Sequence, residues 1–162
     1  MRFEQLREQF RFMRENDIST AEDMTAYQVK EEEKLAGLIK QRTVLKARKK
    51  RRRKLYTALA DTEMLSDAKN ASERGVPGAD EAVRRYADAM STLEKSGIDR
   101  ETLKKEKSEM YNQLAEINRE IRTVRKKLKM CAEISERTPK IKIDLQKIEP
   151  QRQERRKART SR

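Results

Sequence analysis

The chain has 162 residues, of which 41 are Lys or Arg and 28 are Asp or Glu, so its net charge is +13. Hydrophobic residues make up only 35% and aromatic residues 4%, a composition typical of long helices and coiled coils rather than of layered sheets. With no His and one Cys, the sequence excludes His-based metal sites and Ser-His or Cys-His nucleophile pairs, so we expect an all-α, non-enzymatic chain without cofactor or metal.

Two helices are expected before residue 75. A short amphipathic helix over 1–16 is predicted by apolar residues at spacings of three and four: Phe3, Leu6, Phe10 and Met13. Ser19 and Glu22 have the Ser-x-x-Glu spacing of a capping box, which predicts that a second helix begins here. We expect this helix to span 19–74, since that stretch has no Pro and its only Gly is Gly37.

The 19–74 helix carries an interrupted apolar stripe. Its stripe residues follow approximate heptad spacing: Met24, Glu31, Leu35, Leu38, Leu45, Tyr56 and Leu59. The intervening positions Arg42, Lys49 and Arg52 are basic, so packing should be good at both ends of the stripe and poor in its middle. Beyond the helix, two Gly residues and a Pro predict a turn over 75–79.

A short helix is expected over 80–96, capped by Asp80 and ended by Gly97, and a long helix over 99–138 follows it. The long helix has the clearest seam of the sequence: Leu103, Met110, Leu114, Ile117, Ile121, Val124, Leu128 and Cys131. This spacing predicts an antiparallel coiled-coil hairpin with the second helix, in which Cys131 is a buried hydrophobic residue. Pro139 should end the helix, and we expect a short helix over 139–149 and a basic, disordered tail over 150–162.

Positive charge is concentrated in two segments. Residues 46–54 contain eight bases and no acid, and residues 151–162 contain six bases and one acid, so the rest of the chain is neutral. Like charges one turn apart repel, so the 46–54 segment weakens its own helix unless an anion neutralises it. Because a concentrated polycation attracts polyphosphate strongly, nucleic acid is favoured over a solvated face, an acidic protein or a membrane surface.

Fourteen basic residues are candidate nucleic-acid contacts. Eight form the basic block: Lys46, Arg48, Lys49, Lys50, Arg51, Arg52, Arg53 and Lys54. Four form a strip on the 99–138 helix, and two come from the tail: Arg119, Arg122, Arg125 and Lys126, then Arg155 and Arg156. An antiparallel hairpin would bring the strip near the block, giving one electropositive zone.

The tyrosines and one run of acidic residues could take part in binding or catalysis, but we interpret them as structural. Four tyrosines lie at or beside apolar positions and are interpreted as core residues: Tyr27, Tyr56, Tyr86 and Tyr111. Tyr56 adjoins the basic block and is the one we would test as a ligand contact. The acids at 31–33 point in different directions on a helix, so they are poor metal ligands and are interpreted as a solvated face.

Three stretches of the sequence carry a family resemblance: residues 10–18, residues 38–56 and residues 117–145, above all 124–137. They resemble the C-terminal helical region of relaxases of the mobilization-nuclease family, found on conjugative elements of Gram-positive gut bacteria. Relaxases of this family nick DNA at a transfer origin with a Tyr nucleophile and a His-bound metal in an N-terminal domain. Because this chain has no His, the resemblance implies a detached, non-catalytic module.

Three functions remain open at this point. The first is a nucleic-acid-binding module that contacts the phosphate backbone or relaxosome partners, with DNA favoured over RNA. The second is a stand-alone inhibitor of a host nucleoprotein enzyme, of the anti-CRISPR type, which binds a protein or a guide RNA. The third is a homodimerising coiled coil.

A protein partner would bind along the coiled-coil seam or in a basic groove. The chain is expected to be either the tail of a longer relaxase or a short protein that begins at Met1. The sequence shows no apolar run typical of a signal peptide or a membrane span, so we expect a cytoplasmic bacterial location and no membrane partner.

Overall fold

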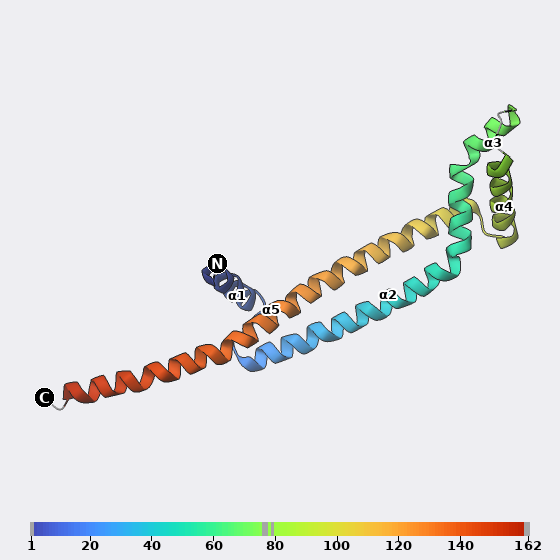
Figure 1. The fold of residues 1–162 in the computed structure, drawn as a ribbon. Helices are drawn as coiled ribbons and strands as arrows, with labels where there is room; N and C mark the ends of the chain where they lie inside the picture. Colours follow the sequence, from blue (N-terminus) through green and yellow to red (C-terminus); the bar gives the residue numbers. More distant parts are fainter. Residues whose placement is uncertain (1, 76–77, 79, 161–162) are drawn as a thin grey trace. The chain divides into compact units, whose positions relative to one another are not determined.

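The computed structural model describes residues 2–75, 78 and 80–160, with side chains described up to Arg137 except those of residues 68, 71 and 72. Within these residues the chain forms five helices and no strand, which confirms the all-α prediction (Figure 1). The helices are α1 (Arg2–Glu15), α2 (Ala21–Met64), α3 (Ser66–Glu73), α4 (Asp80–Ser96) and α5 (Arg100–Thr160). They build two compact units: Met1–Gly37 with Ile121–Arg162 is unit 1, and Leu38–Glu120 is unit 2.

The core of unit 1 joins α1, the start of α2 and part of α5. Its buried residues are Ile18, Met24, Cys131 and Ile134, with Phe12, Met13, Tyr27 and Met130 packed against them. The rings of Phe12 and Tyr27 meet edge to face, with 5.6 Å between their centroids. Cys131 is fully buried, as the seam pattern predicts.

The apolar face of α1 differs from the prediction. Phe3 and Phe10 are 72% and 67% exposed, whereas Phe12, which the sequence pattern did not select, packs against Tyr27. A left-handed residue explains part of the difference: Asp17 has a φ of 54°, and the turn that it completes buries Ile18 beside Met13. The short helix therefore buries the side that carries Phe12 and Met13 and leaves Phe3 and Phe10 in solvent.

Helix α2 begins with a reciprocal cap that lies one residue later than predicted. The hydroxyl oxygen of Thr20 accepts a hydrogen bond from the Asp23 amide at 3.0 Å. In return, the Asp23 carboxylate accepts hydrogen bonds from the amides of Ser19 and Thr20, at 3.0 and 3.1 Å. These amides hold the pKa of Asp23 below its ordinary value. The capping box is thus Thr20 with Asp23, because Asp can play the part of Glu at the third position.

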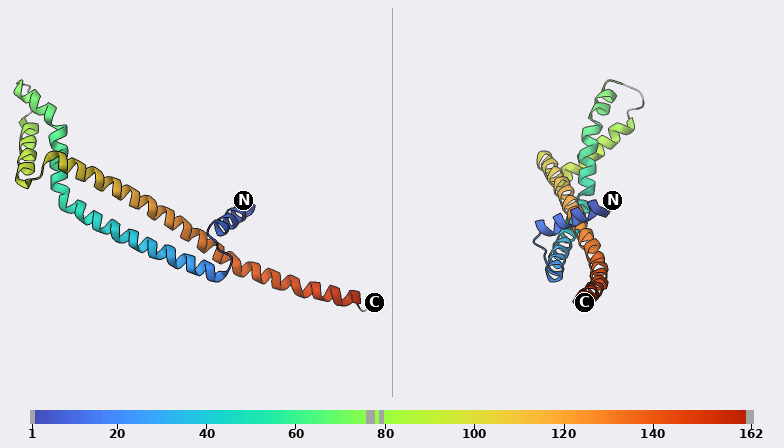
Figure 2. Two further views of the ribbon diagram at one scale, coloured as in Figure 1. Left: turned by 180° about the vertical axis from the view of Figure 1, so that it is seen from behind. Right: turned by 90° about the vertical axis from the view of Figure 1, so that its left-hand side faces the viewer.

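The core of unit 2 lies where α2, α4 and α5 meet. Its buried residues come from all three helices: Tyr56, Ala58, Leu59, Ala89, Leu93, Leu103, Met110 and Leu114. Along this unit α2 and α5 run antiparallel, since Arg42 contacts Asn118 at 3.4 Å and Arg52 contacts Glu106 at 3.2 Å. Helix α3 lies beside α4 (Figure 2). As expected from the basic seam positions, α2 has no fully buried residue between Leu38 and Tyr56.

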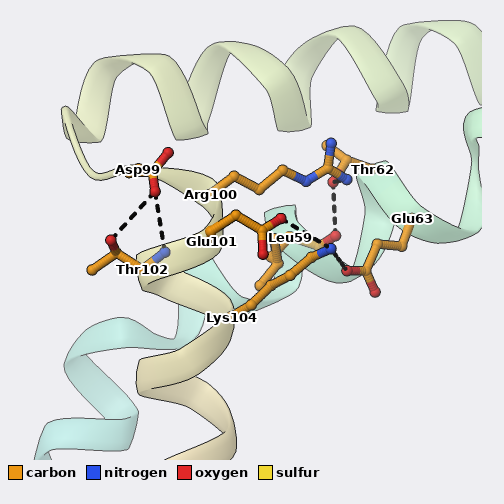
Figure 3. A network of polar contacts seen from close by, with 8 residues as sticks. All are labelled: Leu59, Thr62, Glu63, Asp99, Arg100, Glu101, Thr102 and Lys104. Carbon is orange, nitrogen blue, oxygen red and sulfur yellow. Dashed lines mark hydrogen bonds and ion pairs between the residues drawn. The ribbon is translucent and has the colours of Figure 1, made fainter.

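A polar network fixes the first turn of α5 to the end of α2 (Figure 3). Asp99 accepts a hydrogen bond from the Thr102 amide at 3.4 Å and so caps α5. Arg100 donates to the Thr62 hydroxyl at 2.7 Å, and that hydroxyl donates to the Leu59 carbonyl at 2.8 Å. Lys104 adds an ion pair with Glu63 at 3.2 Å. The network ties the α5 terminus to the apolar core of unit 2.

Several predicted boundaries need correction. The expected 19–74 helix is interrupted at Leu65 and continues as α3. Helix α5 continues through Pro139 and Pro150 to Thr160, so the backbone shows neither a separate 139–149 helix nor a disordered 150–162 tail over its described part. A proline removes one backbone donor and strains the preceding turn, a penalty that does not by itself end a helix of 61 residues.

Two residues of the predicted 75–79 turn are described, Gly75 and Gly78, and both have a left-handed backbone conformation. Gly75 and Gly78 have φ angles of 80° and 85°, values that residues with a Cβ rarely adopt. Residues 76, 77 and 79 of the predicted turn lie outside the described residues. Gly97, at the end of α4, has a φ of 68° and matches the predicted helix-ending glycine.

Candidate nucleic-acid interface

The eight residues of the basic block lie on consecutive turns of α2 in unit 2, and the structure divides them into two groups. Three face α5: Arg48 and Arg52 lie 3.6 and 3.2 Å from the Glu106 carboxylate, and the Lys49 ammonium lies over the Tyr111 ring. The other five are exposed, and none forms an ion pair with a described carboxylate: Lys46, Lys50, Arg51, Arg53 and Lys54. Most of the charge of the block is therefore available to an external anion.

An open pocket of about 540 Å³ adjoins this exposed group. Its cationic wall combines two helices: Lys46, Lys49, Lys50 and Arg53 come from α2, and Lys107 comes from α5. The remaining lining residues are Tyr56, Thr57, Ala60, Asp61 and Tyr111, and we call the whole site the Tyr111 pocket. Its one carboxylate, Asp61, is already paired with Arg85 at 3.3 Å. The pocket thus offers five cations and one neutralised acid to a ligand.

The two tyrosines of this pocket have opposite environments. Tyr56, the tyrosine selected for testing from the sequence, is 5% exposed, and its hydroxyl lies 3.8 Å from the Met110 sulfur. Burial raises its pKa, and the nearby Glu106 charge raises it further. Tyr111, interpreted as a core residue, is instead 44% exposed. Tyr56 is therefore a core residue, and Tyr111 is the aromatic side chain that a ligand can reach.

The predicted strip on α5 is divided between the two units. Arg119 belongs to unit 2 and lies 3.8 Å from Glu116, whereas Arg122, Arg125 and Lys126 are exposed residues of unit 1. The expected closeness of strip and block stays a prediction. In the tail, positions 155 and 156 lie on the helical backbone of α5, and their arginine side chains are outside those that the structure describes.

Unit 1 contains a buried polar cluster around Glu31, a residue of the predicted apolar stripe. Glu31 is 7% exposed, unlike its exposed neighbours Glu32 and Glu33, so the interpretation of all three acids as a solvated face is wrong for Glu31. Its Oε2 atom and the Tyr27 hydroxyl are buried and have no hydrogen-bond partner among the described residues. Burial and the Glu31 charge raise the pKa of the Cys131 thiol, and they raise that of Tyr27 to about 12.

The buried cluster does not make a metal site. Across the described side chains, no group of three or more Cys, Asp or Glu residues could hold a metal ion. The described helices also include none that is both long and apolar enough to cross a membrane. Among the described residues, the basic block and the Tyr111 pocket form the strongest candidate site.

Comparison with known proteins does not identify a family or a function for this chain. No protein-family model matches the sequence, and no curated protein and no solved structure matches it either. The resemblance to the relaxase C-terminal region therefore stays a prediction that depends on the three stretches of sequence that carry it.

Proposed function

We propose that the chain is a non-catalytic nucleic-acid-binding module whose basic block contacts the phosphate backbone. The observation that carries this proposal is the exposed half of the block: five bases on adjacent turns of α2, none paired with a described carboxylate. The bases of such a cluster repel one another along the helix. Their binding to nucleic acid is favourable because they neutralise phosphates and release the counterions condensed on the nucleic acid. A solvated surface needs no concentration of this kind.

The arrangement of the exposed bases suits a phosphate chain. Lys46, Lys50 and Arg53 follow one another at about one residue per helical turn, that is, roughly every 5 Å along α2. Contacts to phosphates position a protein on nucleic acid without reading its sequence. The relaxase resemblance supports the same function, since a detached tail of such an enzyme would hold DNA near the site where another domain nicks it.

The test measures fluorescence anisotropy of labelled duplex DNA with the full chain at two salt concentrations. In the block variant, four exposed bases are replaced while Arg48 and Arg52, which pair with Glu106, are kept: Lys50→Gln, Arg51→Gln, Arg53→Gln and Lys54→Gln. We expect the variant to lose most of the affinity. A plot of the logarithm of the binding constant against the logarithm of the salt concentration should become less steep by about 3 to 4, that is, by about 0.9 for each lost phosphate contact.

A matched control removes the same charge elsewhere. Four exposed lysines outside the block are replaced: Lys30→Gln, Lys34→Gln, Lys40→Gln and Lys95→Gln. This variant should bind DNA with nearly the affinity of the wild type, and circular dichroism should show both variants helical. Equal losses in the two variants, or full binding by the block variant, would contradict a dedicated phosphate site on α2.

A further inference from the structure

The Tyr111 pocket is a recess with the volume of a small-ligand site, whereas contact with a phosphate backbone requires only an exposed surface. Its volume of about 540 Å³ lies within the usual range for such sites, roughly 300 to 1,000 Å³. Two helices contribute to it, so a ligand bound there would contact α2 and α5 together. A regular duplex presents its phosphates on a convex surface and has no group that needs such a recess.

The charges around the pocket select an anion. Lys46, Lys50 and Arg53 stand on α2, and Lys107 stands on α5, while the Asp61 carboxylate is held by Arg85 at 3.3 Å. No other carboxylate lines the pocket among the described residues. A phosphate group in the pocket would therefore meet cations from both helices and little opposing charge.

The pocket also contains an exposed aromatic ring, that of Tyr111, which a phosphate group alone would not need. Tyr111 is 44% exposed although it stands next to Met110, a buried core residue, and the Lys49 ammonium lies 4.7 Å from the centroid of its ring. A cation at this distance from an aromatic face is attracted to it. A nucleobase can stack on the same kind of surface, and the bases of a duplex are already stacked on one another, so only an unpaired base is free to do so.

From these observations we infer that the Tyr111 pocket holds one unpaired nucleotide, with its base against Tyr111 and its phosphate among Lys46, Lys50, Arg53 and Lys107. The chain then prefers single-stranded nucleic acid to duplex. This inference depends on the proposed phosphate binding but goes further, because it requires contact with a base. When a strand binds, the phosphate draws Lys49 from the ring and the base takes the vacated face.

The experiment compares three labelled probes of equal length by anisotropy with the full chain: single-stranded oligothymidylate, the same backbone with every position abasic, and a duplex. We expect oligothymidylate to bind about tenfold more tightly than the abasic strand, because stacking on one aromatic side chain contributes about this factor. The duplex should bind less tightly than oligothymidylate, because its bases are already stacked on one another. Tyr111→Ala should abolish the preference for bases, and Tyr111→Phe, which keeps the ring, should retain it.

Tyr86 provides the matched control. It also has a lysine over its ring, with Lys69 Nζ at 4.9 Å from the centroid, but it does not line the pocket. Tyr86→Ala should leave the preference for bases intact. A measurement on the unaltered chain gives independent evidence: photo-crosslinking to a strand that contains 5-iodouracil should label Tyr111, as located by mass spectrometry.

The outcomes separate the two proposals. Equal affinity for all three probes, with no effect of Tyr111→Ala and no crosslink at Tyr111, would overturn the nucleotide pocket and leave phosphate binding by the block intact. If none of the three probes binds at low salt, both proposals are wrong. A preference for bases that survives Tyr111→Ala but disappears in another variant would also overturn this assignment of the pocket.

Discussion

Glu106 Oε1 accepts a hydrogen bond from Arg52 Nε at 3.2 Å and lies 3.6 Å from a guanidinium nitrogen of Arg48. Among the described carboxylates it is the one that pairs with the basic block. Its side chain is only 17% exposed, so it holds both arginines against α5 from a largely buried position. Glu106 therefore sets how many bases of the block remain free for a ligand.

Glu106→Gln should strengthen nucleic-acid binding. The change releases Arg48 and Arg52 from their partner and raises the local charge by one unit, so we expect a severalfold gain in affinity and a steeper salt slope. The free energy of unfolding should fall by about 0.5 to 1 kcal/mol, since the Arg48 and Arg52 side chains are 54% and 35% exposed and solvent weakens their ion pairs with Glu106. Anisotropy titrations and urea denaturation measure the two effects.

The exposed Glu109 gives the control for this variant. Glu109→Gln changes the net charge of the chain by the same amount without releasing a base of the block. If both variants bind DNA equally, the gain comes from net charge, and Glu106 has no special part in limiting the block.

Thr62→Val should destabilise unit 2. The Thr62 hydroxyl, in a side chain that is 1% exposed, accepts the 2.7 Å hydrogen bond from Arg100, whose Nε is already buried without a described partner. Valine keeps the shape but leaves a charged donor unpaired, which should cost about 2 to 3 kcal/mol in urea denaturation. The cost should nearly vanish in an Arg100→Met background, because no charged donor is then left over. An equal cost in both backgrounds would assign the effect to packing instead.

The helical fold follows from features that the sequence displays openly. Leu103, Ile121 and Val124 recur with the period of a helical seam, and each is almost completely buried. The boundaries were harder to predict, since the break at Leu65 has no Pro or Gly to mark it and Pro139 marks an end that does not occur. Local propensity is a weak determinant where tertiary packing or the cooperative hydrogen bonding of a long helix competes with it.

The sequence predicts where the positive charge of the candidate site lies, but it does not predict which side chains of the site face α5 and which are exposed. The basic block is a local run, so its position on α2 could be read directly from the sequence. Which of its members face α5 depends on Glu106 and Tyr111, which lie more than fifty residues away in the chain. The interpretation of the tyrosines as core residues is right for Tyr56 and wrong for Tyr111, which is 44% exposed. A local pattern does not show which side of a helix its partner helices cover, and that decides whether a ring is buried.

Glu31→Leu should stabilise unit 1. The carboxylate is 7% exposed and its Oε2 atom lacks a described partner, so its burial is unfavourable. Replacing a buried, unpartnered polar group with an apolar one removes that penalty, and we expect the free energy of unfolding to rise by about 1 to 3 kcal/mol. Thermal and urea denaturation provide the measurement. The same substitution at the exposed neighbour, Glu32→Leu, should change stability by less than about 0.5 kcal/mol.

The stability of unit 1 should also fall at alkaline pH through two buried acids of the cluster. Burial, followed by the charge of Glu31, raises the pKa of the Cys131 thiol above its ordinary 9.0. The same causes raise the pKa of Tyr27 from 10.0 to about 12. Both groups are neutral in the folded chain and lose their protons at lower pH when it unfolds. Their contribution to stability is therefore complete below about pH 9 and is lost as the pH rises toward 12.

A variant that lacks both groups isolates this contribution. In the double variant Tyr27→Phe and Cys131→Ala, the free energy of unfolding should decline less steeply between pH 9 and pH 12 than in the wild type. Tyr27→Phe alone should remove the part of the decline above pH 10, and it should cost little at pH 7 because the lost hydroxyl has no described partner. Urea denaturation at pH 8, 10 and 11 measures the slopes. Parallel curves for the wild type and the double variant would show that neither proton is linked to folding.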